Sequence, residues 1–161
     1  MIVSQFAIVT LISLAITLGV ATTGSFFRPD AWYERLRKPR GTPPPWVFPL
    51  VWTLLYILMA FSAALVYLSP ESSWRVAGLI FYALQLLANA AWSWIFFRKH
   101  QILWALGDLI LLLLLVLVCL GIFATISATA AWLLLPYVIW LLVALYLNAA
   151  SWWLNRKNIT F

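Results

Sequence analysis

Five long apolar segments take up most of this 161-residue chain and limit it to one class of fold. They cover approximately residues 3–24, 46–68, 75–97, 102–125 and 129–153, and each is long enough to cross roughly 30 Å of hydrocarbon as a helix. Only 9% of the residues are charged, whereas a soluble domain carries roughly 25%. We therefore predict an all-α integral membrane protein, with residues 1–161 forming a single bundle of five transmembrane helices.

The connection between the first two segments differs from the others. The other connections are short, so the helices that they join must be antiparallel neighbours. Residues 26–45 form a longer loop that is rich in proline and basic residues. Because proline fixes the backbone angle φ, it lowers the entropy lost when such a loop becomes ordered. We predict an ordered lid that lies over one end of the bundle.

The basic residues predict the topology. Nine of them fall on the side that carries the long loop and the C-terminal tail: Arg28, Arg35, Arg37, Lys38, Arg40, Arg98, Lys99, Arg156 and Lys157. The other side carries Arg75 alone. The positive-inside rule then places the N-terminus outside, and the loop and C-terminus in the cytoplasm. The net charge of +6 is explained in this way and gives no reason to expect a nucleic-acid partner. One Cys and one His offer no metal-ligand cluster.

Polar residues within the spans gather in the half of the bilayer beneath the lid. Gln85, Asn89, Trp92 and Ser93 share one helical face, and Trp140, Ala144, Leu147, Asn148 and Ser151 repeat that spacing in the last span. Trp52, Trp104 and Asp108 lie at similar depth, whereas the aliphatic run 109–120 is expected to face lipid. We expect a lid-capped cavity with aromatic walls and a few polar groups, as in small-molecule sites.

Structural roles could explain the same residues. Gln85, Asn89 and Asn148 could only join helices by hydrogen bonds. Asp108, the only acid inside a span, is either functional or the partner of a loop arginine. The tryptophans near span ends are expected to form an interfacial belt: Trp32, Trp46, Trp74, Trp94, Trp132, Trp152 and Trp153.

Several short motifs carry a family resemblance. They are Ala21-Thr22-Thr23-Gly24, Arg28-Pro29-Asp30-Ala31-Trp32-Tyr33, Thr42-Pro43-Pro44, Trp46-Val47-Phe48-Pro49 with Trp52, Gln85-Leu86-Leu87-Ala88-Asn89 with Trp92, Trp104-Ala105-Leu106 with Asp108, and Leu135-Pro136-Tyr137 with Trp140, Ala144 and Asn148. In order and spacing the chain resembles the translocator protein family, also called the tryptophan-rich sensory proteins.

The resemblance implies a five-helix bundle, often a homodimer, in a bacterial cell membrane. It also implies a pocket for porphyrins such as protoporphyrin IX or haem, bound as ligands with no cofactor required. Carried onto this chain, the pocket residues would be Ala21, Tyr33, Pro43, Trp52, Asn89, Trp92, Trp104, Trp140, Ala144, Leu147 and Asn148. To these the depth argument adds Asp108. Gly41 stands where relatives often carry a tryptophan, which would loosen the lid.

Three functions remain open at this point. The first is a membrane receptor or sensor for tetrapyrroles, with ligand transfer or a regulatory role. The second is an enzyme that degrades bound porphyrin in light, for which the resemblance implicates Trp52 and Trp140. The third is a small secondary transporter, although the first span has no charge and no midplane proton relay is visible.

Overall fold

The computed structural model describes residues 2–26 and 30–156, and the side chains of residues 2–4, 21 and 23–26 are outside that description. The described residues form helices and no strands. The helices are α1 (Ile2–Phe26), α2 (Ala31–Arg35), α3 (Val47–Tyr67), α4 (Ser73–Ser93), a π-helical turn η1 (Trp94–Arg98), α5 (Ile102–Ile126) and α6 (Ala128–Asn155).

Four of these helical segments are long and apolar enough to cross a membrane: Val47–Tyr67, Ser73–Arg98, Ile102–Ile126 and Ala128–Asn155. The sequence-based bounds of the last four spans agree with them closely. Within α1 the described apolar stretch is shorter, Gln5–Val20. The all-helical, multi-pass membrane architecture is therefore confirmed, and the fifth crossing stays a prediction.

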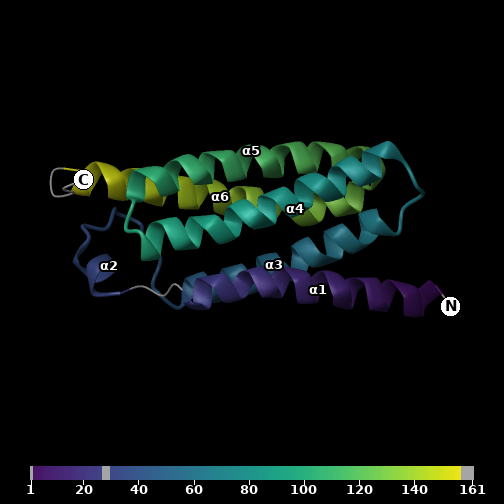
Figure 1. The fold of residues 1–161 in the computed structure, drawn as a ribbon, viewed down its shortest axis with the longest axis horizontal. Coiled ribbons are helices and arrows are strands. Elements are labelled where there is room, and N and C mark those ends of the chain that lie inside the picture. Colours follow the sequence, from purple (N-terminus) through teal and green to yellow (C-terminus); the bar gives the residue numbers. More distant parts are fainter. Residues whose placement is uncertain (1, 27–29, 157–161) are drawn as a thin grey trace.

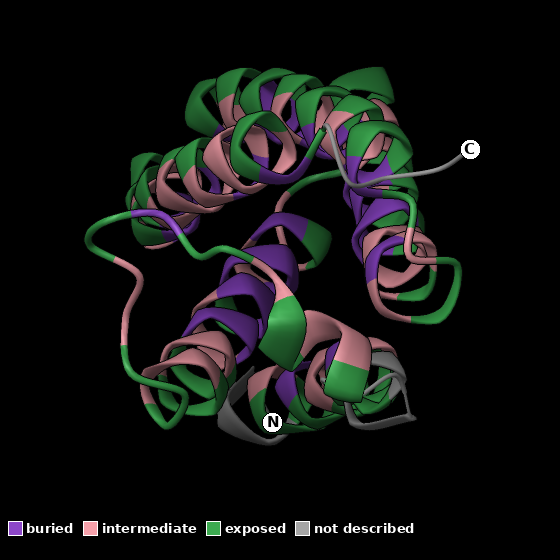
Figure 2. Cartoon of the chain, turned by 90° about the vertical axis from the view of Figure 1, so that its left-hand side faces the viewer, coloured by how far each residue is buried: buried purple, intermediate pink, exposed green. Residues whose placement is uncertain are grey.

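The long helices lie nearly side by side, with α1 packed against α3 and α4, and α5 packed between α4 and α6 (Figure 1). The helix α3 also contacts α6, which closes the bundle. Viewed from the α2 end, the buried residues line the inward sides of the helices and the exposed ones face outward (Figure 2). The short helix α2 lies at the end of the bundle where α6 ends, opposite the start of α1 (Figure 1).

The aliphatic part of α5 does not face lipid on all sides. Leu109, Leu112 and Val116 are at most 2% exposed and belong to the main core, whereas Leu111 and Leu114 are exposed. The expectation that the whole 109–120 run faces lipid is therefore wrong. A helix packed on one side buries residues three and four apart and leaves the rest to the bilayer.

Helix ends follow local side-chain chemistry. The Ser72 hydroxyl accepts a hydrogen bond from the Arg75 amide at the start of α4, and Ser127 accepts one from the Ala130 amide at the start of α6. These are N-caps, which satisfy amides that the helix itself leaves unpaired. The turn from η1 to α5 places His100 at φ 57°, an uncommon angle for a residue with a side chain.

Hydrogen bonds hold the part of the lid that the structure describes. The Asp30 carboxylate accepts hydrogen bonds from the Trp32 and Tyr33 amides and caps α2. Gly41 has φ +80°, a conformation that glycine adopts without strain, in the turn that follows Pro39. The side chain of Asn155 both accepts from the Arg37 amide and donates to the Arg37 carbonyl, each at 3.0 Å. These two bonds fix the lid to the end of α6.

Candidate ligand-binding site

Two tyrosines and two amides form a buried hydrogen-bonded chain between α3, α4 and α6. The Tyr56 hydroxyl donates to Asn89 Oδ1 at 2.9 Å, and Asn89 Nδ2 donates to the Tyr137 hydroxyl at 2.9 Å. The Tyr137 hydroxyl in turn donates to Gln85 Oε1 at 3.1 Å. Gln85 Nε2 is buried with no hydrogen-bond partner among the described residues. All four side chains are therefore used structurally, and one amide donor, that of Gln85, remains.

Aromatic rings extend this chain toward the lid. Trp52 stacks on Tyr56 with the ring centroids 5.4 Å apart, and it meets the Tyr137 ring edge-on at 6.0 Å. One turn beyond Tyr137, Trp140 packs edge-on against Phe48 at 5.9 Å. We call Trp52, Tyr56, Gln85, Asn89, Tyr137 and Trp140 the aromatic–amide cluster. Its rings come from α3 and α6, and its amides come from α4.

The indole nitrogen of Trp140 is a buried donor without an acceptor in the described part of the chain. Leaving such a group unpaired costs about 1–3 kcal/mol, so native proteins rarely tolerate it without a reason. Trp140 is itself only half-buried, and it packs on the main core through its ring. A hydrogen-bond acceptor on a bound molecule would satisfy this N–H group.

Asn148 has a structural role in the same half of the bundle. In the amide orientation that satisfies both of its polar atoms, Oδ1 accepts from Trp92 Nε1 and Nδ2 donates to the Ile102 carbonyl, each at 3.0 Å. This side chain therefore ties the end of α4 and the start of α5 to α6. It also fixes the Trp92 ring, which stacks on Phe96 at 5.0 Å.

The lid packs onto this second aromatic group. Tyr33 meets Phe96 and Phe97 edge-on, with centroids 6.1 and 5.5 Å apart, and Lys38 Nζ lies 4.6 Å from the centre of the Tyr33 ring. Burial raises the pKa of Tyr33 above its ordinary value. Trp92 packs against both this group and the main core, so it connects the lid to the aromatic–amide cluster.

His100 also holds the lid. Its ring stacks on Trp32 with the centroids 4.2 Å apart, and its Nε2 lies 3.0 Å from Asp30 Oδ2. The hydrogen bond from the Tyr33 amide lowers the pKa of Asp30, partial desolvation opposes this, and His100 lowers it further. The loop between η1 and α5 is thus joined to the start of α2.

Trp104 lies outside the aromatic–amide cluster. Its side chain is 72% exposed, which groups it with the exposed Trp46, Trp74 and Trp132 near other helix ends. Such exposure suits the tryptophan belt at a membrane interface. By contrast, Trp52, Trp92 and Trp140 are half-buried and pack on the core.

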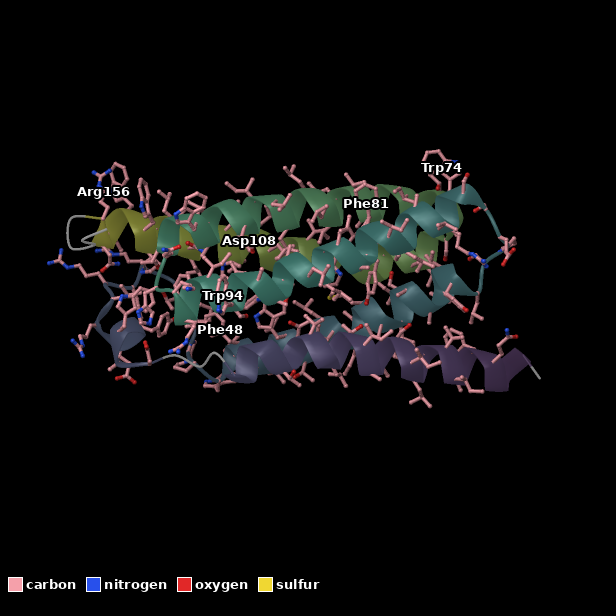
Figure 3. The ribbon with its side chains drawn as sticks, viewed as in Figure 1. Phe48, Trp74, Phe81, Trp94, Asp108 and Arg156 are labelled. Carbon is pink, nitrogen blue, oxygen red and sulfur yellow. The ribbon has the colours of Figure 1, made fainter. Side chains whose placement is uncertain are left out.

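The other predicted site residues are distributed around the cluster. Asp108 is half-buried, its Oδ2 has no hydrogen-bond partner in residues 2–26 and 30–156, and no ion pair joins it to a described loop arginine. Figure 3 places it in the half of the bundle nearest the lid, as it does Phe48. Ala144 packs on the main core, Pro43 and Leu147 are half-buried, and the side chain of Ala21 lies outside the described residues.

Sequence reasoning missed Tyr56, Tyr137 and Phe48 as members of this region. Spacing could have found the tyrosines, because Tyr56 is four residues after Trp52 and Tyr137 is three residues before Trp140. Each pair therefore shares one helical face. The same spacing could have found Phe48, which is four residues before Trp52, although its contact with Trp140 joins two helices that are distant in sequence.

Comparison with known proteins adds independent information. The model of the TspO/MBR family matches residues 9–154. Protein CrtK of Rhodobacter capsulatus is 43% identical over 141 residues, covering 86% of this chain and 88% of the relative. The tryptophan-rich sensory protein of Cereibacter sphaeroides is 39% identical over 84% of each chain, and the human translocator protein is 36% identical over 87% of this chain and 85% of its own. The chain belongs to the TspO/MBR family.

Proposed function

We propose that this protein is a membrane receptor that binds a tetrapyrrole, such as protoporphyrin IX or haem, beside the aromatic–amide cluster and beneath the lid. Relatives named tryptophan-rich sensory protein and translocator protein fit a sensing or transfer role. The proposal includes five crossings, with α1 as the first, an external N-terminus and a cytoplasmic lid in a bacterial membrane. A homodimer belongs to the same proposal.

The observation that carries this proposal is the Trp140 N–H group, which is buried without an acceptor among the described residues and lies beside the half-buried ring of Phe48. A porphyrin is a flat π-system that can stack on Trp52, and its carboxylates or pyrrole nitrogens can accept from an indole. Basic residues of the lid such as Arg35 and Lys38 supply a positive potential for its propionates. Because Trp92 packs on both the main core and the lid group, a ligand bound beneath the lid would be shielded from bulk water on that side.

The test compares two matched tryptophan variants of α6. Trp140→Phe keeps an aromatic ring and removes the N–H group, whereas Trp132→Phe makes the same change at a 71% exposed position of the same helix. We expect Trp140→Phe to weaken protoporphyrin IX binding roughly three- to tenfold, the value of one hydrogen bond, and Trp132→Phe to leave it unchanged. Binding is followed in the dark by porphyrin absorbance of the detergent-solubilised protein.

Saturation at a fixed stoichiometry distinguishes a site from partitioning into micelles. Linear uptake without saturation, equal in wild type and Trp140→Phe, would overturn the proposal. Saturable binding that is identical in all three proteins would retain a receptor but remove Trp140 from its site.

A second candidate function is breakdown of bound porphyrin driven by light and oxygen. The observation that favours it is the position of Trp52 and Trp140 on α3 and α6, two helices that contact each other. The Trp52 ring meets the ring of Tyr137, which lies one turn before Trp140 on α6. Indoles in that arrangement can be oxidised by an excited porphyrin. Product that forms at the same rate in a Trp52→Phe/Trp140→Phe double variant with wild-type binding would rule out a catalytic role for these residues.

A further inference from the structure

A groove of about 560 Å³ opens on the outer surface where the lid meets the end of α6. Lys38 and Arg40 line it from the lid, and Tyr146, Ala150 and Trp153 line it from α6. It shares no residue with the aromatic–amide cluster, and one of its lining residues, Lys38, also contacts the lid aromatic group, with its Nζ 4.6 Å from the centre of the Tyr33 ring.

The lining of the groove combines an apolar floor with positive charge. Tyr146 and Trp153 are 53% and 59% exposed, so their rings face the surroundings of the bundle. The Arg156 guanidinium lies 3.3 Å from the centre of the Trp153 ring and adds a third cation to Lys38 and Arg40. All four acids of the chain lie in the described residues, and none lines the groove. The local charge is therefore uncompensated.

Hydrogen bonds hold the backbone that carries the two lid cations. The Tyr146 hydroxyl donates to the Arg40 carbonyl at 3.1 Å, and Asn155 pairs with both backbone groups of Arg37. The backbone on each side of Lys38 is thus attached to α6. An anion that binds here meets a preformed site, which lowers the entropy lost on binding.

We propose that this groove binds the headgroup of an anionic phospholipid, with its phosphate between Lys38 and Arg40. The acyl chains would then follow the exposed apolar side of α6, where Leu142 and Tyr146 are more than half exposed. A lipid fits better than a free anion because the groove combines cations with a tryptophan and a tyrosine at the end of a membrane-spanning helix. This inference does not depend on tetrapyrrole binding.

The experiment is native mass spectrometry of the detergent-solubilised full-length protein, titrated with phosphatidylglycerol and with phosphatidylcholine of the same acyl chains. Wild type should retain phosphatidylglycerol preferentially. Each cation near an anionic headgroup contributes about a fivefold factor in affinity. The double variant Lys38→Gln/Arg40→Gln should therefore weaken the retention of phosphatidylglycerol about 25-fold, to the level of phosphatidylcholine. Arg156→Gln, which leaves the lid untouched, should weaken it about fivefold.

The matched control is Arg98→Gln/Lys99→Gln. It removes two cations from the same end of the bundle. One of them, Lys99, lies over a tryptophan as Arg156 does, with its Nζ 4.9 Å from the centre of the Trp94 ring. Retention of phosphatidylglycerol should be unchanged in this control.

Four outcomes would overturn the proposal. Wild type could retain both lipids equally, which would show no preference for an anionic headgroup. Both double variants could lose phosphatidylglycerol equally, which would indicate an effect of net charge rather than a site. Millimolar inorganic phosphate could displace the lipid completely, which would indicate a free-anion site. A fall in the dimer fraction of Lys38→Gln/Arg40→Gln with unchanged lipid retention would instead assign the groove to a second copy of the chain.

Discussion

Asn155 should control how often the lid opens. Its side chain is 4% exposed and makes two 3.0 Å hydrogen bonds to the Arg37 backbone. A third bond, from Nδ2 to the Ser151 carbonyl at 2.7 Å, orients the amide within α6. Each net hydrogen bond contributes about 0.5–1.5 kcal/mol, so the two bonds to Arg37 contribute about 2 kcal/mol to lid closure. In Asn155→Ala the opening equilibrium of the lid should therefore rise about 30-fold.

Hydrogen exchange of the Arg37 amide reports the loss of this attachment, because that amide donates to Asn155 Oδ1 and the variant both removes its acceptor and favours release of the lid. Its protection should fall about 30-fold in Asn155→Ala, while amides in the middle of α6 keep theirs. Tyr146→Phe provides the comparison, since it removes a single, more exposed bond to the Arg40 carbonyl and should change protection only a few-fold. Equal protection of Arg37 in wild type and Asn155→Ala would refute this account of the lid.

Two further predictions concern packing and pH. In Gly78→Ala the new Cβ would lie 3.0 Å from Phe123 Cε1 and 3.1 Å from Ile122 Cγ2, so thermal unfolding in detergent should show a loss of stability of about 1–3 kcal/mol. The control is Gly121→Ala, whose Cβ has no atom within 4 Å and which should be neutral or stabilising. Equal effects of the two substitutions would contradict the packing argument. Because the pKa of Asp30 is lowered below 3.8, its charged cap stabilises α2 above that pH and is lost as the pH falls through the lowered value. The NMR shift of the Tyr33 amide should report this loss, and Asp30→Asn, whose oxygen still caps the helix, should remove the pH dependence.

The helices could be predicted from sequence more fully than their contacts. Long apolar segments identify α3 to α6, and Ser72 and Ser127 mark helix starts because a hydroxyl there caps free amides. The inward face of α5 could not be chosen in advance, because a nearly uniform aliphatic run has no polar side to define it. The resemblance assigns Trp104 to the pocket, but a motif match does not say which neighbour a side chain meets, and here the Trp104 side chain is 72% exposed.

The two attachments of the lid differ in kind, and this determines which end of it can open. The α2 end is held by the packing of Tyr33 and by the pair of Asp30 and His100, whose side chains are 46% and 38% exposed, so salt and pH can weaken the polar part of that contact. The Arg37 end is held by neutral hydrogen bonds to the buried Asn155, which salt does not screen. Opening of the α2 end about Arg37 should therefore precede full release of the lid, which also breaks the two Asn155–Arg37 bonds and is the step that Asn155→Ala promotes. A ligand would then enter past Tyr33, between the lid and the end of α4, while the groove beside Arg40 stays formed.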